Sequence, residues 1–167
     1  MSASFAESRV RGADLLVRAL AVAGVERVFT LSGNHVMPVF DALLDARIEL
    51  IHVRQEAAAV HMADAVGRLT GWPGVALVTG GQGHTNAVAA LYPAMAADSP
   101  LLLLSGHAPL AEAGLGSFQE LAQADLARPT SKASWTAASV ATVGHDVARA
   151  WSTAVGGRPG PVHLSLP

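Results

Sequence analysis

Two apolar runs in the middle of the chain constrain its fold more than any other feature. The segments GVALVTG (74–80) and PLLLLSG (100–106) contain hardly any polar side chains. Successive side chains of a strand point to opposite faces, so strands of this kind must be covered on both faces. Segments with helical character stand between such runs. This alternation of strand and helix is typical of a parallel sheet that lies between two layers of helices.

The rest of the sequence continues this alternation. Apolar residues recur at helical spacing in GADLLVRALAVAG (12–24), and glycines at 24 and 71 stand where two helices should end. Helices are expected at 12–24, 36–46, 55–70, 85–97, 120–126 and 143–155. Strands are expected at 26–31, 49–53, 74–80, 100–106, 130–134 and 160–167. We predict an α/β three-layer sandwich for residues 12–167, with a doubly wound, mostly parallel sheet of about six strands and helices on both faces. Residues 1–11 are expected to form an N-terminal tail.

The composition excludes several classes of function. Eleven basic and thirteen acidic residues give a net charge of −2, and no basic cluster offers a binding surface for nucleic acid. No apolar run is long enough to cross a membrane. The chain has no cysteine, which excludes disulfides and thiolate chemistry. The seven histidines are not spaced three or four apart on any expected helix, so no metal ligands are predicted.

The apolar content suggests that part of the surface is covered by other protein. Hydrophobic residues make up 51% of the chain and charged residues only 14%. A subunit or domain interface would bury such a surplus. The first fourteen residues contain no apolar segment of a secretory signal, and we expect a cytoplasmic protein.

Polar and glycine residues gather at the carboxyl ends of the expected strands. These ends read TLSGNH, HVRQE, VTGGQGHTN and LLSGHAP. Ligands of open parallel sheets bind beyond the carboxyl ends of the strands, so these segments should converge on one edge. A loop at 81–86 and a long connection at 107–120 are expected beside them, and long connections of this kind are often functional.

The residues at this edge also have structural explanations. Glu56 stands in a first helical turn, where an acidic side chain favours the helix dipole and can act as a cap. The glycines of GGQGHTN fit a tight turn between strand and helix. That loop lacks the dinucleotide-binding pattern, because Asn86 stands where its last glycine belongs, and it lacks the Gly-Lys-Ser/Thr end of a phosphate loop. His35, His84 and His107 are either polar loop residues or donors to a substrate.

Five blocks, in the same order, resemble one family. They are GADLLVRALAVAGVERVFTLSGNHVMPVFDAL, HVRQEAAAVHMADAVGRLTG, GVALVTGGQGHTNAVAALYPAMAADSPLLLLSG, FQELAQADLARPTSKASW and GRPGPVHLSLP. Together they are similar to the N-terminal pyrimidine-binding (PYR) domain of thiamine-diphosphate-dependent enzymes, in the acetolactate synthase-like branch. That branch also contains decarboxylases, carboligases and 2-hydroxyacyl-CoA lyases.

The resemblance implies a role for each residue at the edge. Glu56 falls on the family's glutamate, which hydrogen-bonds the aminopyrimidine ring of the cofactor and so activates it for attack on a 2-oxo acid. Gly33, Thr79, Gly83 and Asn86 fall on cofactor-lining positions. The family's common SGPGATN reads GGQGHTN here, so that Gln82 and His84 are departures, and serine replaces the proline usual before Gly33.

Substrate contacts and further domains are also implied. The resemblance places His84 and Gln119 toward the substrate. In the family, a different domain holds the diphosphate and Mg²⁺ through a Gly-Asp-Gly segment, which does not occur in this sequence. A middle domain carries FAD in some members. We therefore expect part of a longer carboligase or decarboxylase, inactive alone, that forms a homodimer or higher oligomer through this domain.

Two other functions stay open at this point. The chain could be a non-catalytic or split-enzyme subunit that pairs with a diphosphate-binding chain, which the apolar surplus also fits. A nucleotide-binding protein of the Rossmann type is disfavoured by Asn86.

Overall fold

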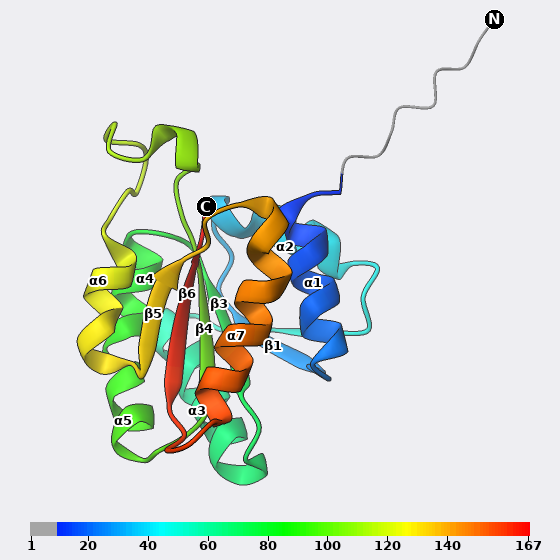
Figure 1. The fold of residues 1–167 in the computed structure, drawn as a ribbon, viewed down its shortest axis with the longest axis vertical. Coiled ribbons are helices and arrows are strands. Elements are labelled where there is room, and N and C mark those ends of the chain that lie inside the picture. Colours follow the sequence, from blue (N-terminus) through cyan, green and yellow to red (C-terminus); the bar gives the residue numbers. More distant parts are fainter. Residues whose placement is uncertain (1–9) are drawn as a thin grey trace, which may run out of the picture.

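The computed structural model describes residues 10–167, which form one sheet with helices on both faces (Figure 1). The sheet has six parallel strands in the order β2-β1-β3-β4-β6-β5. The strands are β1 (Arg27–Thr30), β2 (Glu49–His52), β3 (Gly74–Val78), β4 (Leu101–Gly106), β5 (Ala133–Thr136) and β6 (Pro161–Leu166). The predicted α/β three-layer fold is confirmed. Of the expected tail, residues 1–9 lie outside the described part of the chain.

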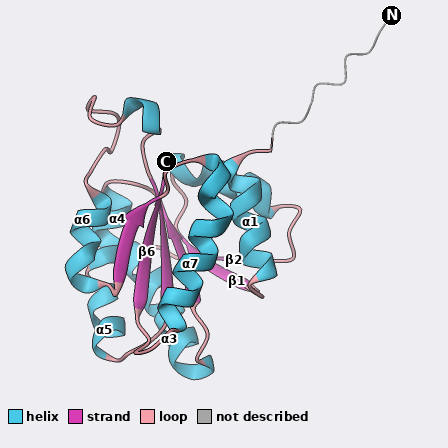
Figure 2. Ribbon diagram, in the orientation of Figure 1, coloured by secondary structure: helices cyan, strands magenta, loops and turns pink. Residues whose placement is uncertain are grey.

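Helices make up the two outer layers (Figure 2). They are α1 (Gly12–Val22), α2 (Met37–Leu43), α3 (Glu56–Thr70), α4 (Gln82–Val88), α5 (Leu91–Ala96), α6 (Gln123–Ala127) and α7 (Val143–Val155). Four short 3₁₀ turns accompany them: η1 (Asn34–Val36), η2 (Leu110–Glu112), η3 (Arg128–Thr130) and η4 (Val140–Thr142). Between residues 10 and 167, no helix is long and apolar enough to cross a membrane.

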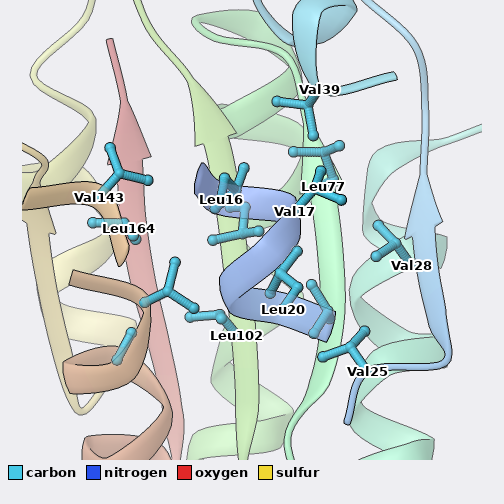
Figure 3. Packing of buried hydrophobic residues seen from close by; sticks show 14 of the residues in the cluster. Leu16, Val17, Leu20, Val25, Val28, Val39, Leu77, Leu102, Val143 and Leu164 are labelled. Atoms are coloured by element: carbon cyan, nitrogen blue, oxygen red, sulfur yellow. The ribbon is translucent and has the colours of Figure 1, made fainter. Parts of the chain in front are cut away.

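The side chains of the central strands alternate between two hydrophobic cores. In β4, Leu102 and Leu104 contact the core under α1, α2 and α7, whereas Leu101 and Leu103 contact the core under α3, α4 and α5. All four are fully buried. Figure 3 shows the first core, where Leu16, Val17 and Leu20 of α1 lie over the sheet. The uninterrupted apolar runs are therefore explained by burial on both faces of the sheet.

Two of the expected helix ends lie at glycines with left-handed backbone. Gly71 caps α3 with φ of +74°, and Gly24 follows α1 with φ of +80°. Side chains other than glycine rarely adopt this region, so both glycines end their helices for a conformational reason.

The segment after β3 differs from the prediction. Residues 81–86 were expected as a loop before a helix at 85–97, but α4 already begins at Gln82 and a second helix, α5, begins at Leu91. Proline has no backbone N–H, so Pro93 cannot donate to the carbonyl of Ala89, and a continuous helix is interrupted there. The strand expected at 130–134 begins at Ala133 instead, because η3, which contains Pro129, occupies residues 128–130.

The strand order reverses between β1 and β3. From β1 the chain continues outward to β2, then returns to place β3 on the other side of β1. The segments that follow β1 and β3 therefore leave the sheet in opposite directions. Ligands of doubly wound sheets bind at such a reversal point.

Candidate functional site

The turns after β1 and β3 touch each other at this reversal point. A Cβ atom on Gly33 would lie 2.3 Å from Cβ of Thr79, closer than real atoms allow. Gly33 has an extended backbone with φ of −175°, so it is required by space and not by conformation. The contact fixes the position of Thr79, the first residue after β3.

Glu56 is the first residue of α3 but does not cap the helix. The cap is Gln55, whose side-chain oxygen accepts a hydrogen bond from the backbone N–H of Ala58 at 3.2 Å. Glu56 is only 9% exposed, and its Oε2 accepts a hydrogen bond from the side-chain amide of Asn86 at 3.0 Å. Among residues 10–167, no other hydrogen bond to this carboxylate is found. The other oxygen of this buried carboxylate has no partner within the described residues and is available to hydrogen-bond a ligand.

Gly83 packs closely against Thr79 and Glu56. A Cβ atom on Gly83 would lie 2.8 Å from Cγ2 of Thr79 and 3.4 Å from Oε1 of Glu56. The structure thus brings together the five residues that the sequence placed around the cofactor: Gly33, Glu56, Thr79, Gly83 and Asn86. Small residues on one side and a carboxylate with a free oxygen on the other fit a flat, nitrogen-containing ring.

His84 points away from this site, into the domain. Its side chain is fully buried, its Nδ1 lies 2.8 Å from Oγ of Ser105, and its ring lies 4.5 Å from that of His163. Burial lowers the pKa of His84 to about 4, although the backbone of Gln123 partly opposes this effect. Helix α4 turns His84 inward together with Gly83, Ala87 and Val88. The sequence expected His84 near the substrate, but this geometry gives it no open surface.

Gln119 lies beside the glycine loop, which is the Gly80–Gly81 turn between β3 and α4. It is partly buried and has φ of +57°, and a Cβ atom on Gly81 would lie 2.6 Å from Cβ of Gln119. It belongs to the long connection after β4, which stands at the carboxyl edge (Figure 1). Glu120 organises this connection by accepting hydrogen bonds from the backbone N–H groups of Gly114, Gly116 and Ser117. These bonds lower the pKa of Glu120.

Two further residues belong to this edge: His35, which the sequence offered as a polar loop residue or a substrate donor, and Gln123, which the sequence did not indicate. His35 lies with its Nδ1 3.3 Å from Oγ1 of Thr79, and its ring stacks on Phe118 at 6.0 Å. Gln123 is 1% exposed and hydrogen-bonds the backbone of Gly81. The position of His35 in a loop after a strand was only a weak indication of a role in the site. No local pattern marks Gln123, because its partner stands far away in the sequence.

No metal centre is evident in the described part of the chain, since residues 10–167 contain no group of three or more His, Cys, Asp or Glu side chains that could hold an ion.

Comparisons with known proteins agree with this geometry. Residues 10–126 match the family described as thiamine pyrophosphate enzyme, N-terminal TPP binding domain. The chain is 40% identical to the acetolactate synthase isozyme 3 large subunit of Escherichia coli over 93% of its length. It is 39% identical to 2-hydroxyacyl-CoA lyase 2 of Danio rerio over 96% of its length, and 35% identical to a probable acetolactate synthase large subunit of Methanocaldococcus jannaschii over 95%.

These relatives are much longer than the chain. It spans 27% of the Escherichia coli protein, 26% of the Danio rerio protein and 27% of the Methanocaldococcus jannaschii protein. The family match covers well over half of the chain and includes the five residues brought together at the carboxyl edge, from Gly33 to Asn86. The chain therefore belongs to the N-terminal TPP binding domain family of thiamine pyrophosphate enzymes.

Proposed function

We propose that this domain binds the aminopyrimidine ring of thiamine diphosphate and that Glu56 is the residue that activates it. The observation that carries the proposal is the buried Glu56 carboxylate, which Asn86 holds by one oxygen and whose other oxygen lies close to Gly83. In the proposed reaction, the whole protein acts as a carboligase or decarboxylase on 2-oxo acids. The names of the relatives, acetolactate synthases and 2-hydroxyacyl-CoA lyases, are consistent with this class.

The proposed work of this chain's own residues is proton control and positioning. Glu56 would hydrogen-bond a ring nitrogen through its free oxygen and pass a proton to and from it. Asn86 fixes the carboxylate, while Gly33, Gly83 and Thr79 let the backbone approach the flat ring. When bound, thiamine diphosphate supplies the nucleophile and the electron sink that acyl transfer between 2-oxo acids requires.

The remaining groups of the active centre are proposed to come from other parts of the protein. A diphosphate-binding domain of the same or another chain would hold the diphosphate and Mg²⁺, and a middle domain would carry any FAD. Gln119, at the glycine loop, is the proposed substrate-side residue of this domain. We also propose a cytoplasmic location and a homodimer or higher oligomer. Exposed apolar side chains on α3 and α5 support an oligomer, including Leu69 at 86% and Tyr92 at 65% exposure.

The substitution Glu56→Gln tests the proposal in the whole protein that contains this domain. The side chain keeps its size and its place beside Asn86 but no longer holds an acidic proton. We expect turnover that depends on thiamine diphosphate to fall by about 100-fold or more, in line with the loss of a general acid or base. The thermal unfolding midpoint should change little.

Glu26→Gln is the matched control, because Glu26 is 81% exposed at the opposite end of β1. It should leave turnover unchanged. Full activity of Glu56→Gln would refute the proposed role of this carboxylate. A folded whole protein with no dependence on thiamine diphosphate would instead favour the alternative, a non-catalytic pairing subunit.

A further inference from the structure

We infer that Gln123 is a positioning residue for this site, acting through the backbone of Gly81. The inference rests on the proposed function, because it concerns how Glu56 and Asn86 are held in place. In this inference, the buried side chain of Gln123 in α6 determines where α4 begins.

The side-chain amide of Gln123 makes three hydrogen bonds. Oε1 accepts from the N–H of Gly81 at 2.8 Å, and Nε2 donates to the carbonyl of Gly106 at 3.1 Å and to Oγ of Ser165 at 2.9 Å. Both donor hydrogens of the amide are therefore used, together with one of the two lone pairs of its oxygen. Gln123 thereby connects the glycine loop to the carboxyl ends of β4 and β6.

Gly81 needs such a partner because its backbone is in an unusual conformation. It has φ of 59° and ψ of −110°, and it precedes the first residue of α4 as its N-cap. A side chain at this position would collide with Gln119. The bond from Gln123 and the contact with Gln119 therefore hold Gly81 from two sides in a conformation that only glycine adopts readily.

The position of Gly81 sets the position of α4. This helix has seven residues and no side-chain cap, so it has little stability of its own and depends on contacts with the rest of the domain. It carries Gly83 and Asn86, the residues that shape the space beside Glu56 and hold its carboxylate. A shift at Gly81 would reach Glu56 through a single short helix.

The test is Gln123→Met in the whole protein. Methionine fills a similar volume and cannot make the three hydrogen bonds. We expect the concentration of thiamine diphosphate needed for half-maximal activity to rise roughly tenfold, as for the loss of one well-placed hydrogen bond. Turnover at saturating cofactor should fall less than threefold. Hydrogen–deuterium exchange of the segment that contains Gly81 should accelerate.

Two controls separate positioning from general stability. Ser131→Ala removes a buried hydrogen bond, to the carbonyl of Ala127, beyond the other end of α6. Ser165→Ala removes one partner of Gln123 but leaves its bond to Gly81. Both should lower the unfolding midpoint without raising the cofactor requirement. If Gln123→Met does not fold, Gln123→Asn gives the same comparison, since its amide is one methylene too short to reach Gly81.

The outcomes distinguish this inference from the proposed function. A raised cofactor requirement together with faster exchange at Gly81 supports the positioning role. A lower unfolding midpoint with an unchanged cofactor requirement overturns it, as does unchanged exchange at Gly81. If Glu56→Gln, measured in parallel, retains full turnover, the proposed function fails, whatever Gln123→Met shows.

Discussion

The side-chain amide of Asn86 donates a hydrogen bond to Glu56 at 3.0 Å, joining residues thirty positions apart in the sequence. The bond connects the start of α3 with α4, two helices on the same face of the sheet. It fixes a nearly buried carboxylate by one oxygen and leaves the other oxygen close to Gly83. The arrangement of the Glu56 carboxylate therefore depends on how α3 and α4 pack together and not on a single loop.

The first prediction concerns this bond. Asn86→Ala should leave the Glu56 carboxylate free to rotate, because the only hydrogen bond to it among residues 10–167 is lost. We expect the affinity of the whole protein for thiamine diphosphate to fall about fivefold, the effect of about 1 kcal/mol. Titration calorimetry measures it, with Gln82→Ala, an exposed residue of the same helix, as the control. Equal affinity in the two variants would contradict the predicted role of Asn86.

The second prediction concerns a methyl group added at Gly83. Alanine in a helix is usually more stable than glycine by about 1 kcal/mol. At Gly83, however, the added methyl group would stand 2.8 Å from Thr79 and fill the space beside Glu56. Gly83→Ala should therefore abolish binding of thiamine diphosphate at concentrations that saturate the wild type, while the protein remains folded by circular dichroism.

Gly144 provides a matched control for Gly83. It lies in the first turn of α7, and a Cβ atom there would meet nothing within 4 Å. Gly144→Ala should raise the free energy of unfolding by about 0.5–1 kcal/mol and leave cofactor binding unchanged. Normal binding by Gly83→Ala would show that the ring does not occupy the space at Gly83.

The third prediction is a loss of stability in mild acid. Burial lowers the pKa of His84 to about 4 from its ordinary 6.5, and burial also lowers that of His163 well below 6.5. A charged His107 would lower both further. The unfolded chain therefore binds protons between pH 6.5 and 4 that the folded chain does not. The contribution to the free energy of unfolding is complete above about pH 6.5 and is lost as the pH falls toward 4.

From His84 alone, we expect the free energy of unfolding to fall by about 2 kcal/mol between pH 7.5 and pH 5. Urea unfolding at the two pH values measures this difference. His84→Leu should reduce the pH dependence by that amount, because the remaining carboxylates titrate in both proteins. An identical pH dependence in His84→Leu would show that His84 is not buried neutral.

The sequence predicted the architecture well because its signals are local. Apolar runs such as PLLLLSG need burial on two faces, and glycines at 24 and 71 end helices through their own backbone freedom. The meeting of Gly33, Glu56, Thr79 and Asn86 also follows from topology, since the carboxyl ends of parallel strands share an edge.

The details around α4 could not be predicted, because they depend on distant residues. The helix begins at Gln82, and the preceding Gly81 hydrogen-bonds Gln123, which stands 42 positions away. That starting point turns His84 inward, toward His163 on β6. Local patterns contain neither of these pairings, so the loop expected at 81–86 was incorrect and the burial of His84 could not be predicted.

The fourth prediction concerns the apolar surface of α5. Tyr92 is 65% exposed, and Met95 beside it is 37% exposed. If this face forms a subunit interface, Tyr92→Glu should shift the protein toward monomer by placing a charge where apolar area is buried. Light scattering at several concentrations measures the change. Leu44→Glu is the control, since Leu44 is 80% exposed but follows α2 on the other face of the sheet. The same mass for both variants would place the interface elsewhere.

The last prediction separates the two adjacent residues at the start of α3. Gln55 accepts the N–H of Ala58 and so caps the helix, whereas Glu56 is bonded to Asn86. Gln55→Ala should lower the free energy of unfolding by about 1 kcal/mol, the usual effect of losing a cap, and leave the cofactor affinity within twofold of the wild type. Glu56→Gln should show the opposite pattern, with near-normal stability and lost turnover. Urea unfolding and cofactor titration on both variants make the comparison. If Glu56→Gln lost stability as Gln55→Ala does while keeping its turnover, the carboxylate would serve only the helix.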